Sequence, residues 1–165
     1  MSILSNNKTF YINLIIIISI FILDRSTKLY VIYLDQINNG SEIFSSKILN
    51  VNLIWNEGIA FGLFSFDEKL YYNFLTIFIC LITVVIIWLM FRSSGFEKLS
   101  YIMIIGGSLG NIFDRIFYSA VPDFIDIHIN NFHWFIFNVA DIFITLGVIS
   151  LISIELFTKK LKNED

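Results

Sequence analysis

The sequence predicts an all-α integral membrane protein that is built mainly from four transmembrane helices. Two observations lead to this prediction. Of the 165 residues, 56% are hydrophobic and only 15% are charged, whereas soluble domains are about 45–50% apolar and about 25% charged. The apolar residues also gather in four long runs, and a helix needs about 20 mostly apolar residues to cross a bilayer. A soluble domain of this size could not bury so much apolar surface.

The four runs cover residues 10–34, 71–91, 99–117 and 137–157. No small-residue cleavage site follows the first run, so we interpret it as a retained helix and not as a removed signal peptide. The second run has no charged residue, the third carries Asp114 near its end, and the fourth carries Asp141 near its start. Hydrocarbon offers no hydrogen bonds to an open backbone, so each run is expected to be helical. Residues 1–165 are expected to form one membrane domain.

The segment between the first two spans, residues 35–70, is too long for a simple turn. Residues 48–55 partly alternate between apolar and polar side chains, which predicts a strand. Residues 61–70 are expected to form a short interfacial helix that leads into the second span. The segment is therefore interpreted as a small folded cap. Residues 118–136, between the last two spans, are expected to form a shorter loop on the same side.

Basic residues outside the spans predict the orientation, because they are enriched in cytoplasmic loops. Six of them lie on one side, at the two ends of the chain and between the second and third spans. They are Lys8, Arg92, Lys98, Lys159, Lys160 and Lys162. The other side carries only Lys47 and Lys69. Both termini are therefore expected to be cytoplasmic, with the cap on the outer side.

Several charged residues lie inside the spans, where each costs about 2.5–3.5 kcal/mol at the bilayer centre. The long side chain of Arg25 is expected to extend to the headgroups, which the shorter side chain of an aspartate cannot do. Asp24, Asp114 and Asp141 come from three helices and are predicted to lie at similar depth, near the outer leaflet. This coincidence indicates a functional site.

The spacing of two of these acids suggests their chemistry. Asn111 and Asp114 are three residues apart, as are Asn138 and Asp141, so each pair shares one face of its helix. If the two faces meet, two close carboxyl groups cannot both ionise easily, and the pair separates into an acid and a base. We therefore predict an aspartate dyad, Asp114 and Asp141, that activates water. Such pairs are also common in helix packing and in proton relays.

Other chemistries have weaker support. The net charge of −3 provides no basic surface for nucleic acid. Cys80 is the only cysteine, and His128 and His133 are five residues apart, which does not suit one helix face, so no metal site and no cofactor are expected. The glycines of residues 106–110 lie inside a span and predict close helix packing.

A proton- or ion-relay subunit is the main alternative function. It would use Asp24, Asp114 and Asp141 as successive stations at staggered depths. Glu155 is the only acidic or basic residue in the inner halves of the spans, and it lies near the cytoplasmic end of the fourth span. This distribution disfavours a relay.

Several sequence blocks together resemble the lipoprotein signal peptidases (signal peptidase II). They are residues 23–28 (LDRSTK), 56–62 (NEGIAFG), 106–115 (GGSLGNIFDR) with its continuation 121–125 (VPDFI), and 137–141 (FNVAD). The blocks and the four spans cover nearly the whole chain. The sequence departs from the family at Ser119, where glycine is common, and at Pro122, where valine is common.

This resemblance implies an aspartyl endopeptidase of the bacterial inner (cytoplasmic) membrane. Its substrates would be prolipoproteins, cleaved just before a cysteine that carries diacylglycerol, and its outer cap would be a small β-cradle with a short interfacial helix. Membrane lipid and inhibitory cyclic peptides of the globomycin type would be further partners. No cofactor is implied.

The resemblance also implies roles for individual residues. By position, the catalytic pair would be Asp114 and Asp141. Residues that frame the pair or bind substrate would be Asn56, Gly58, Asn111, Arg115 and Asn138. Asp24 and Lys28 would be structural polar residues.

Overall fold

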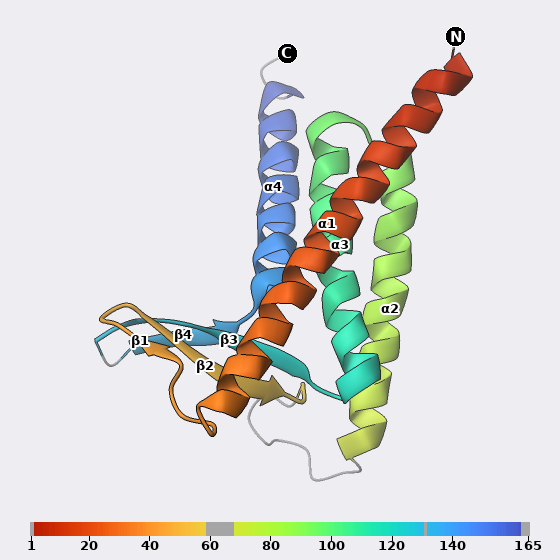
Figure 1. Cartoon of the computed structure of the whole chain (residues 1–165). Helices are drawn as coiled ribbons and strands as arrows, with labels where there is room; N and C mark the ends of the chain where they lie inside the picture. Colours follow the sequence, from red (N-terminus) through yellow and green to blue (C-terminus); the bar gives the residue numbers. More distant parts are fainter. Residues whose placement is uncertain (1, 59–67, 131, 163–165) are drawn as a thin grey trace.

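The computed structural model describes residues 2–58, 68–130 and 132–162, which form a helical bundle with a small sheet at one end (Figure 1). The helices are α1 (Ser2–Ile37), α2 (Glu68–Arg92), α3 (Gly95–Tyr118) and α4 (Val139–Lys162). The strands are β1 (Phe44–Ser45), β2 (Leu49–Asn56), β3 (Val121–Ile129) and β4 (Phe132–Phe137). The mostly helical architecture with a small sheet agrees with the prediction from the sequence.

Helix α3 is the central helix and contacts each of the other three. The glycines of α3 allow α1 and α4 to approach closely, because glycine has no side chain. A Cβ atom on Gly106 would lie 2.8 Å from Cβ of Ile20 on α1, and one on Gly107 would lie 2.5 Å from the carbonyl oxygen of Ala140 on α4. The prediction that this glycine-rich segment serves close helix packing is therefore confirmed.

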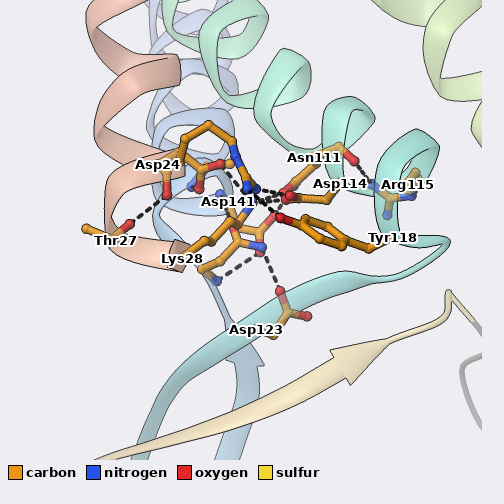
Figure 2. A network of polar contacts seen from close by, with 12 residues as sticks. Asp24, Thr27, Lys28, Asn111, Asp114, Arg115, Tyr118, Asp123 and Asp141 are labelled. Carbon is orange, nitrogen blue, oxygen red and sulfur yellow. Dashed lines mark hydrogen bonds and ion pairs between the residues drawn. The ribbon is translucent and has the colours of Figure 1, made fainter. Parts of the chain in front are cut away.

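The outer faces of the bundle are apolar and exposed. Large exposed side chains include Ile15 on α1, Phe74 on α2, Ile116 on α3 and Ile152 on α4. Two segments, Tyr72–Arg92 and Val139–Lys159, are long and apolar enough to cross a membrane by length and composition. Four charged residues of α1 and α3 are buried inside the bundle: Asp24, Arg25, Lys28 and Asp114. Figure 2 shows three of them, Asp24, Lys28 and Asp114, close together.

The sheet is antiparallel, with the strand order β1-β2-β3-β4. Strand β2 confirms the strand that was predicted at 48–55. The expectation of a loop at 118–136 is wrong, because β3 and β4 form a hairpin there. The alternation of Ile125, Ile127 and Ile129 with polar residues is a strand signal that the loop interpretation overlooked. The interfacial helix predicted at 61–70 lies largely outside the described residues, and α2 begins at Glu68.

The turn from α3 into β3 takes place at Ser119, which has a φ of 56°. This left-handed conformation favours glycine, because a Cβ atom crowds the backbone there. The positive φ explains why glycine would suit the position of Ser119. The turn sends β3 back beneath the end of α3, so that the strand carries its residues to the charged end of the bundle (Figure 2).

Candidate active site

A buried cluster of charges joins α1 to α3 (Figure 2). The ammonium group of Lys28 donates hydrogen bonds to Oδ2 of Asp24 at 2.8 Å, to Oδ1 of Asn111 at 2.8 Å and to Oδ2 of Asp114 at 2.6 Å. Lys28, Asp24 and Asp114 expose none of their surface (0%). The lysine therefore has three oxygen partners, which satisfies all three of its donors.

Arg25 completes this cluster. Its guanidinium group donates to Oδ1 of Asp114 and, at 3.2 Å, to the hydroxyl oxygen of Tyr118. The same group lies 4.7 Å from the centre of the Phe113 ring. The expectation that Arg25 extends to the headgroups is wrong, because its side chain turns into the bundle to neutralise a buried acid. Both oxygens of Asp114 are thus occupied by cations.

Asp24 links three helices. Its Oδ1 accepts a 2.9 Å hydrogen bond from the backbone N–H of Ala140 in the first turn of α4. Its carboxyl group also packs directly against Gly110 of α3, where any larger residue would collide with it. An acid at a helix N-terminus satisfies a free N–H group and meets the positive end of the helix dipole. This geometry supports the structural role that was expected for Asp24 and Lys28.

Asp141 lies in the first turn of α4 and is framed by the two asparagines that the sequence singled out. The side-chain amide of Asn111 donates to Oδ1 of Asp141 at 2.8 Å. The backbone N–H of Asn138 donates to Oδ2 at 3.1 Å, and the N–H of Asp141 donates back to Oδ1 of Asn138 at 3.1 Å. These reciprocal bonds form a helix cap that holds the carboxyl group in place.

Asp114 and Asp141 do not meet directly. Within the described residues, no hydrogen bond joins the two carboxyl groups, and the side chain of Asn111 links Lys28 to Asp141 instead. The cluster around Asp114 is thus connected to Asp141 through Asn111.

A third acid, Asp123 on β3, lies beside Asp141 and was not singled out from the sequence. Its Oδ1 accepts a 2.6 Å hydrogen bond from the side-chain amide of Asn138, and its Oδ2 accepts one of 2.9 Å from Asn56. Burial raises the pKa of Asp123 above its ordinary value, and the charge of Asp141 adds to this, while the bonds from Asn56 and Asn138 oppose it. The pKa of Asp123 thus responds to the charge of Asp141.

The end of β2 lies against the same acid. Asn56 accepts a 2.8 Å hydrogen bond from the N–H of Gly58, which fixes the asparagine amide toward Asp123. A cavity of about 450 Å³ opens here. It is lined by Ile54, Trp55, Asn56, Glu57, Asp123 and Ile136. Asp123 and Glu57 are the acidic residues that line this cavity.

Arg115, the remaining predicted site residue, lies on α3 at the edge of the cluster (Figure 2). Its Nη1 donates to the backbone carbonyl of Asn111 at 3.2 Å. Its Nε is buried and has no hydrogen-bond partner within the described residues. A substrate contact for Arg115 stays a prediction.

Comparison with known proteins gives consistent results. A family model described as signal peptidase (SPase) II matches residues 16–157. The chain is 51% identical over 160 residues to a lipoprotein signal peptidase of Pelagibacter ubique (strain HTCC1062), covering 97% of this chain and 96% of the relative. It is 40% identical over 167 residues to a lipoprotein signal peptidase of Blochmanniella pennsylvanica (strain BPEN), covering 96% and 98%.

Solved structures resemble the fold as well. One bacterial membrane enzyme structure superposes with a TM-score of 0.70 at 27% identity, over 87% of this chain and 92% of the other. A second has a TM-score of 0.67 at 27% identity, over 93% and 91%. The similarity therefore extends over the helical bundle and the sheet together.

Proposed function

The chain belongs to the signal peptidase II family, a family of proteases that remove signal peptides from prolipoproteins, and we propose how its residues perform that cleavage. The reaction uses water that is activated by two carboxyl groups, Asp123 on β3 and Asp141 on α4. The bond is cut just before the cysteine that carries diacylglycerol. No cofactor takes part in these steps.

The observation that carries the assignment is the position of Asn138 between the two acids. Its side-chain amide donates to Asp123 at 2.6 Å, and its backbone N–H donates to Asp141 at 3.1 Å. One residue thus orients both carboxyl groups. Two carboxyl groups held close together resemble the catalytic pair of aspartic peptidases. In such a pair one group is protonated while the other is ionised.

Asp114 is unsuited to this role. Both of its oxygens bind cations, Arg25 and Lys28, and the residue has no exposed surface. We assign it instead to the charge cluster that holds α1 against α3.

The chemistry follows from the two environments. Asp141 is half-buried and serves as the base, accepting a proton from a water molecule as the water oxygen attacks the scissile carbonyl carbon. Asp123, whose raised pKa favours its protonated form, donates a proton to the carbonyl oxygen. The resulting gem-diol then returns one hydroxyl proton to Asp123. Asp141 gives its proton to the leaving nitrogen as the C–N bond breaks, which restores both carboxyl groups.

Substrate binding is assigned to the cavity beside Asp123. Asn56 lines this cavity. Gly58 lies two residues further along the chain and donates a hydrogen bond to Asn56. We propose that the extended residues of the prolipoprotein lie along this loop, with Arg115 nearby on α3. Inhibitory cyclic peptides of the globomycin type would occupy the same space.

We also propose the placement in the membrane. Residues 1–165 form one membrane domain, and α1, α2, α3 and α4 all cross the bacterial inner membrane. The exposed apolar side chains on all four helices support this proposal. Both termini lie at the opposite end of the bundle from the sheet (Figure 1). The basic residues outside the spans are concentrated at the terminal end, so that end is assigned to the cytoplasm and the site to the outer leaflet.

A cleavage assay tests the function. The purified full chain in detergent is mixed with a prolipoprotein whose cysteine carries diacylglycerol, and in parallel with the same precursor bearing an unmodified cysteine. Release of the signal peptide from the modified precursor alone is expected. Equal cleavage of the two precursors, or cleavage of neither, would contradict the proposal.

A further inference from the structure

The hairpin β3–β4 brings two histidines together at a distance from the carboxyl pair. His128 and His133 are partners across the two strands, and their rings stack with centres 4.9 Å apart. Asp126 lies two residues before His128 on the same strand, so it faces the same side of the sheet. The nearest ligand atoms of the three side chains all lie within 4.8 Å of one another.

One of these side chains has an unsatisfied group. His128 is only 9% exposed, and its buried Nδ1 has no hydrogen-bond partner in the described part of the chain. A buried polar atom without a partner costs about 1–3 kcal/mol. The Nδ1 lone pair of His128 is thus available to bind a metal ion.

The other two side chains are already oriented toward each other. Nδ1 of His133 lies 2.8 Å and 3.1 Å from the two carboxylate oxygens of Asp126. The Asp126 side chain is buried, whereas that of His133 is 52% exposed. The exposed histidine leaves a route by which a small ion can enter, and its side chain can turn without disturbing the core.

These spacings agree with a tetrahedral zinc site. Zinc binds histidine nitrogen and carboxylate oxygen at about 2.0–2.2 Å, so neighbouring ligand atoms lie roughly 3.3 Å apart and two bound imidazoles have ring centres roughly 5 Å apart. The pair of Asp126 and His133 and the ring separation of the two histidines are close to these values.

We propose that Asp126, His128 and His133 bind a zinc ion that connects the two strands of the hairpin. Two nitrogens and one carboxylate oxygen favour zinc over magnesium or calcium, which prefer oxygen ligands alone. The site is separate from the carboxyl pair, because Asp126 is three residues along the strand from Asp123, a distance of roughly 10 Å. The ion stabilises the hairpin that carries Asp123, and it takes no part in the cleavage step.

The spacing of the two histidines had argued against a metal. Residues five apart lie on different faces of a helix, but on either side of a hairpin turn they can lie directly opposite each other. The strand pairing is what assembles the three ligands.

Zinc binding to the purified full chain tests this proposal. The protein is prepared without a histidine tag, equilibrated with micromolar zinc chloride in detergent, and its bound metal is measured. One zinc ion per chain is expected, together with a higher midpoint of thermal unfolding. Because the chain has only two histidines, His133→Gln should weaken binding at least about tenfold. The exposed neighbour Phe132 provides the control, and Phe132→Leu should bind zinc as the parent chain does.

A second readout reports the ligand geometry. Cobalt(II) in place of zinc should give the visible absorption of a tetrahedral ion in the parent chain and in Phe132→Leu, and His133→Gln should lose it. Binding well below one zinc ion per chain would overturn the proposal. Stoichiometric binding that is unchanged by both His133→Gln and Asp126→Asn would overturn it equally.

Discussion

The side-chain amide of Asn138 donates a 2.6 Å hydrogen bond to Oδ1 of Asp123. This contact connects the residue just before α4 to β3, and it places Asp123 next to the acid of the first turn of α4. The second oxygen of Asp123 accepts a hydrogen bond from Asn56. Two amides thus favour the ionised carboxylate, while burial opposes ionisation more strongly and raises the pKa.

The first prediction concerns the pH dependence of cleavage. The N–H of Asn56 favours ionised Asp123, so Asn56→Ala should raise the pKa of that carboxyl further above its ordinary value. Since Asp123 acts in its protonated form, the alkaline limb of the kcat/KM profile should move to higher pH, by about one unit for one lost hydrogen bond to a charged group. The measurement is the kcat/KM of cleavage against pH.

Asn50→Ala, on the same strand, is the matched control and should leave the limb unchanged. An alkaline limb that stays in place or moves to lower pH in Asn56→Ala would contradict the assignment of Asp123 as the acid. The raised pKa also has a consequence for stability. The contribution of Asp123 to the free energy of unfolding is fully present below its ordinary pKa and is lost as the pH rises through the raised value.

The second prediction concerns the charge cluster between α1 and α3. Lys28 contacts Asp24, Asn111 and Asp114 and has no exposed surface. Lys28→Met should therefore destabilise the protein by about 3–5 kcal/mol, because it leaves a buried negative charge without its partner. Arg25→Gln should cost less, since Lys28 still neutralises Asp114. The midpoint of thermal unfolding in detergent measures both.

The surface provides the control for this comparison. Lys159 pairs with Glu155 at 3.1 Å, and both side chains are largely exposed. Such surface pairs contribute little, so Lys159→Met should leave the unfolding midpoint nearly unchanged. If Lys28→Met had as small an effect as Lys159→Met, the cluster would not hold the two helices together.

The third prediction concerns the contact between α3 and α4. A Cβ atom on Gly107 would lie 2.5 Å from the carbonyl oxygen of Ala140, which is backbone and cannot turn aside. Gly107→Ala should therefore push the two helices apart and cost about 1–3 kcal/mol. The unfolding midpoint should fall in Gly107→Ala and stay near the parent value in Ile116→Ala, an exposed position on the same helix. Equal midpoints for the two variants would be inconsistent with this packing.

The helices could be predicted from the sequence because lipid imposes a simple rule on length and hydropathy. The contact between Asn138 and Asp141 could also be predicted, because Asn138 lies three residues before Asp141, at the start of the fourth span. The hairpin β3–β4 was overlooked, although its alternating side chains mark it as extended. Its apolar residues were interpreted as part of a loop because the neighbouring spans dominate the hydropathy pattern.

The partners of Asp123 could not be predicted in the same way. Asn138 and Asn56 are 15 and 67 residues away along the chain, and only the packing of β2, β3 and α4 brings them together. For Asp114, the i,i+3 spacing correctly placed Asn111 on its helix face. The spacing contained no information about Arg25 and Lys28, which reach Asp114 from another helix and occupy both of its oxygens.

The central claim is that Asp123, and not Asp114, acts with Asp141, and the kcat of three variants tests it most directly. Asp123→Asn and Asp141→Asn should each lower kcat for cleavage of a diacylglyceryl prolipoprotein by about 10³-fold or more. The double variant Arg25→Gln/Asp114→Asn removes one positive and one negative buried charge, so the cluster remains balanced by Lys28 and Asp24.

This double variant should fold and keep a kcat within about tenfold of the parent chain, because Asp114 has no part in the chemical step. The kcat of the double variant is measured on the folded protein after its isolation by gel filtration. The opposite pattern would contradict the account: a folded double variant as inactive as Asp141→Asn, with Asp123→Asn still cleaving at nearly the parental rate.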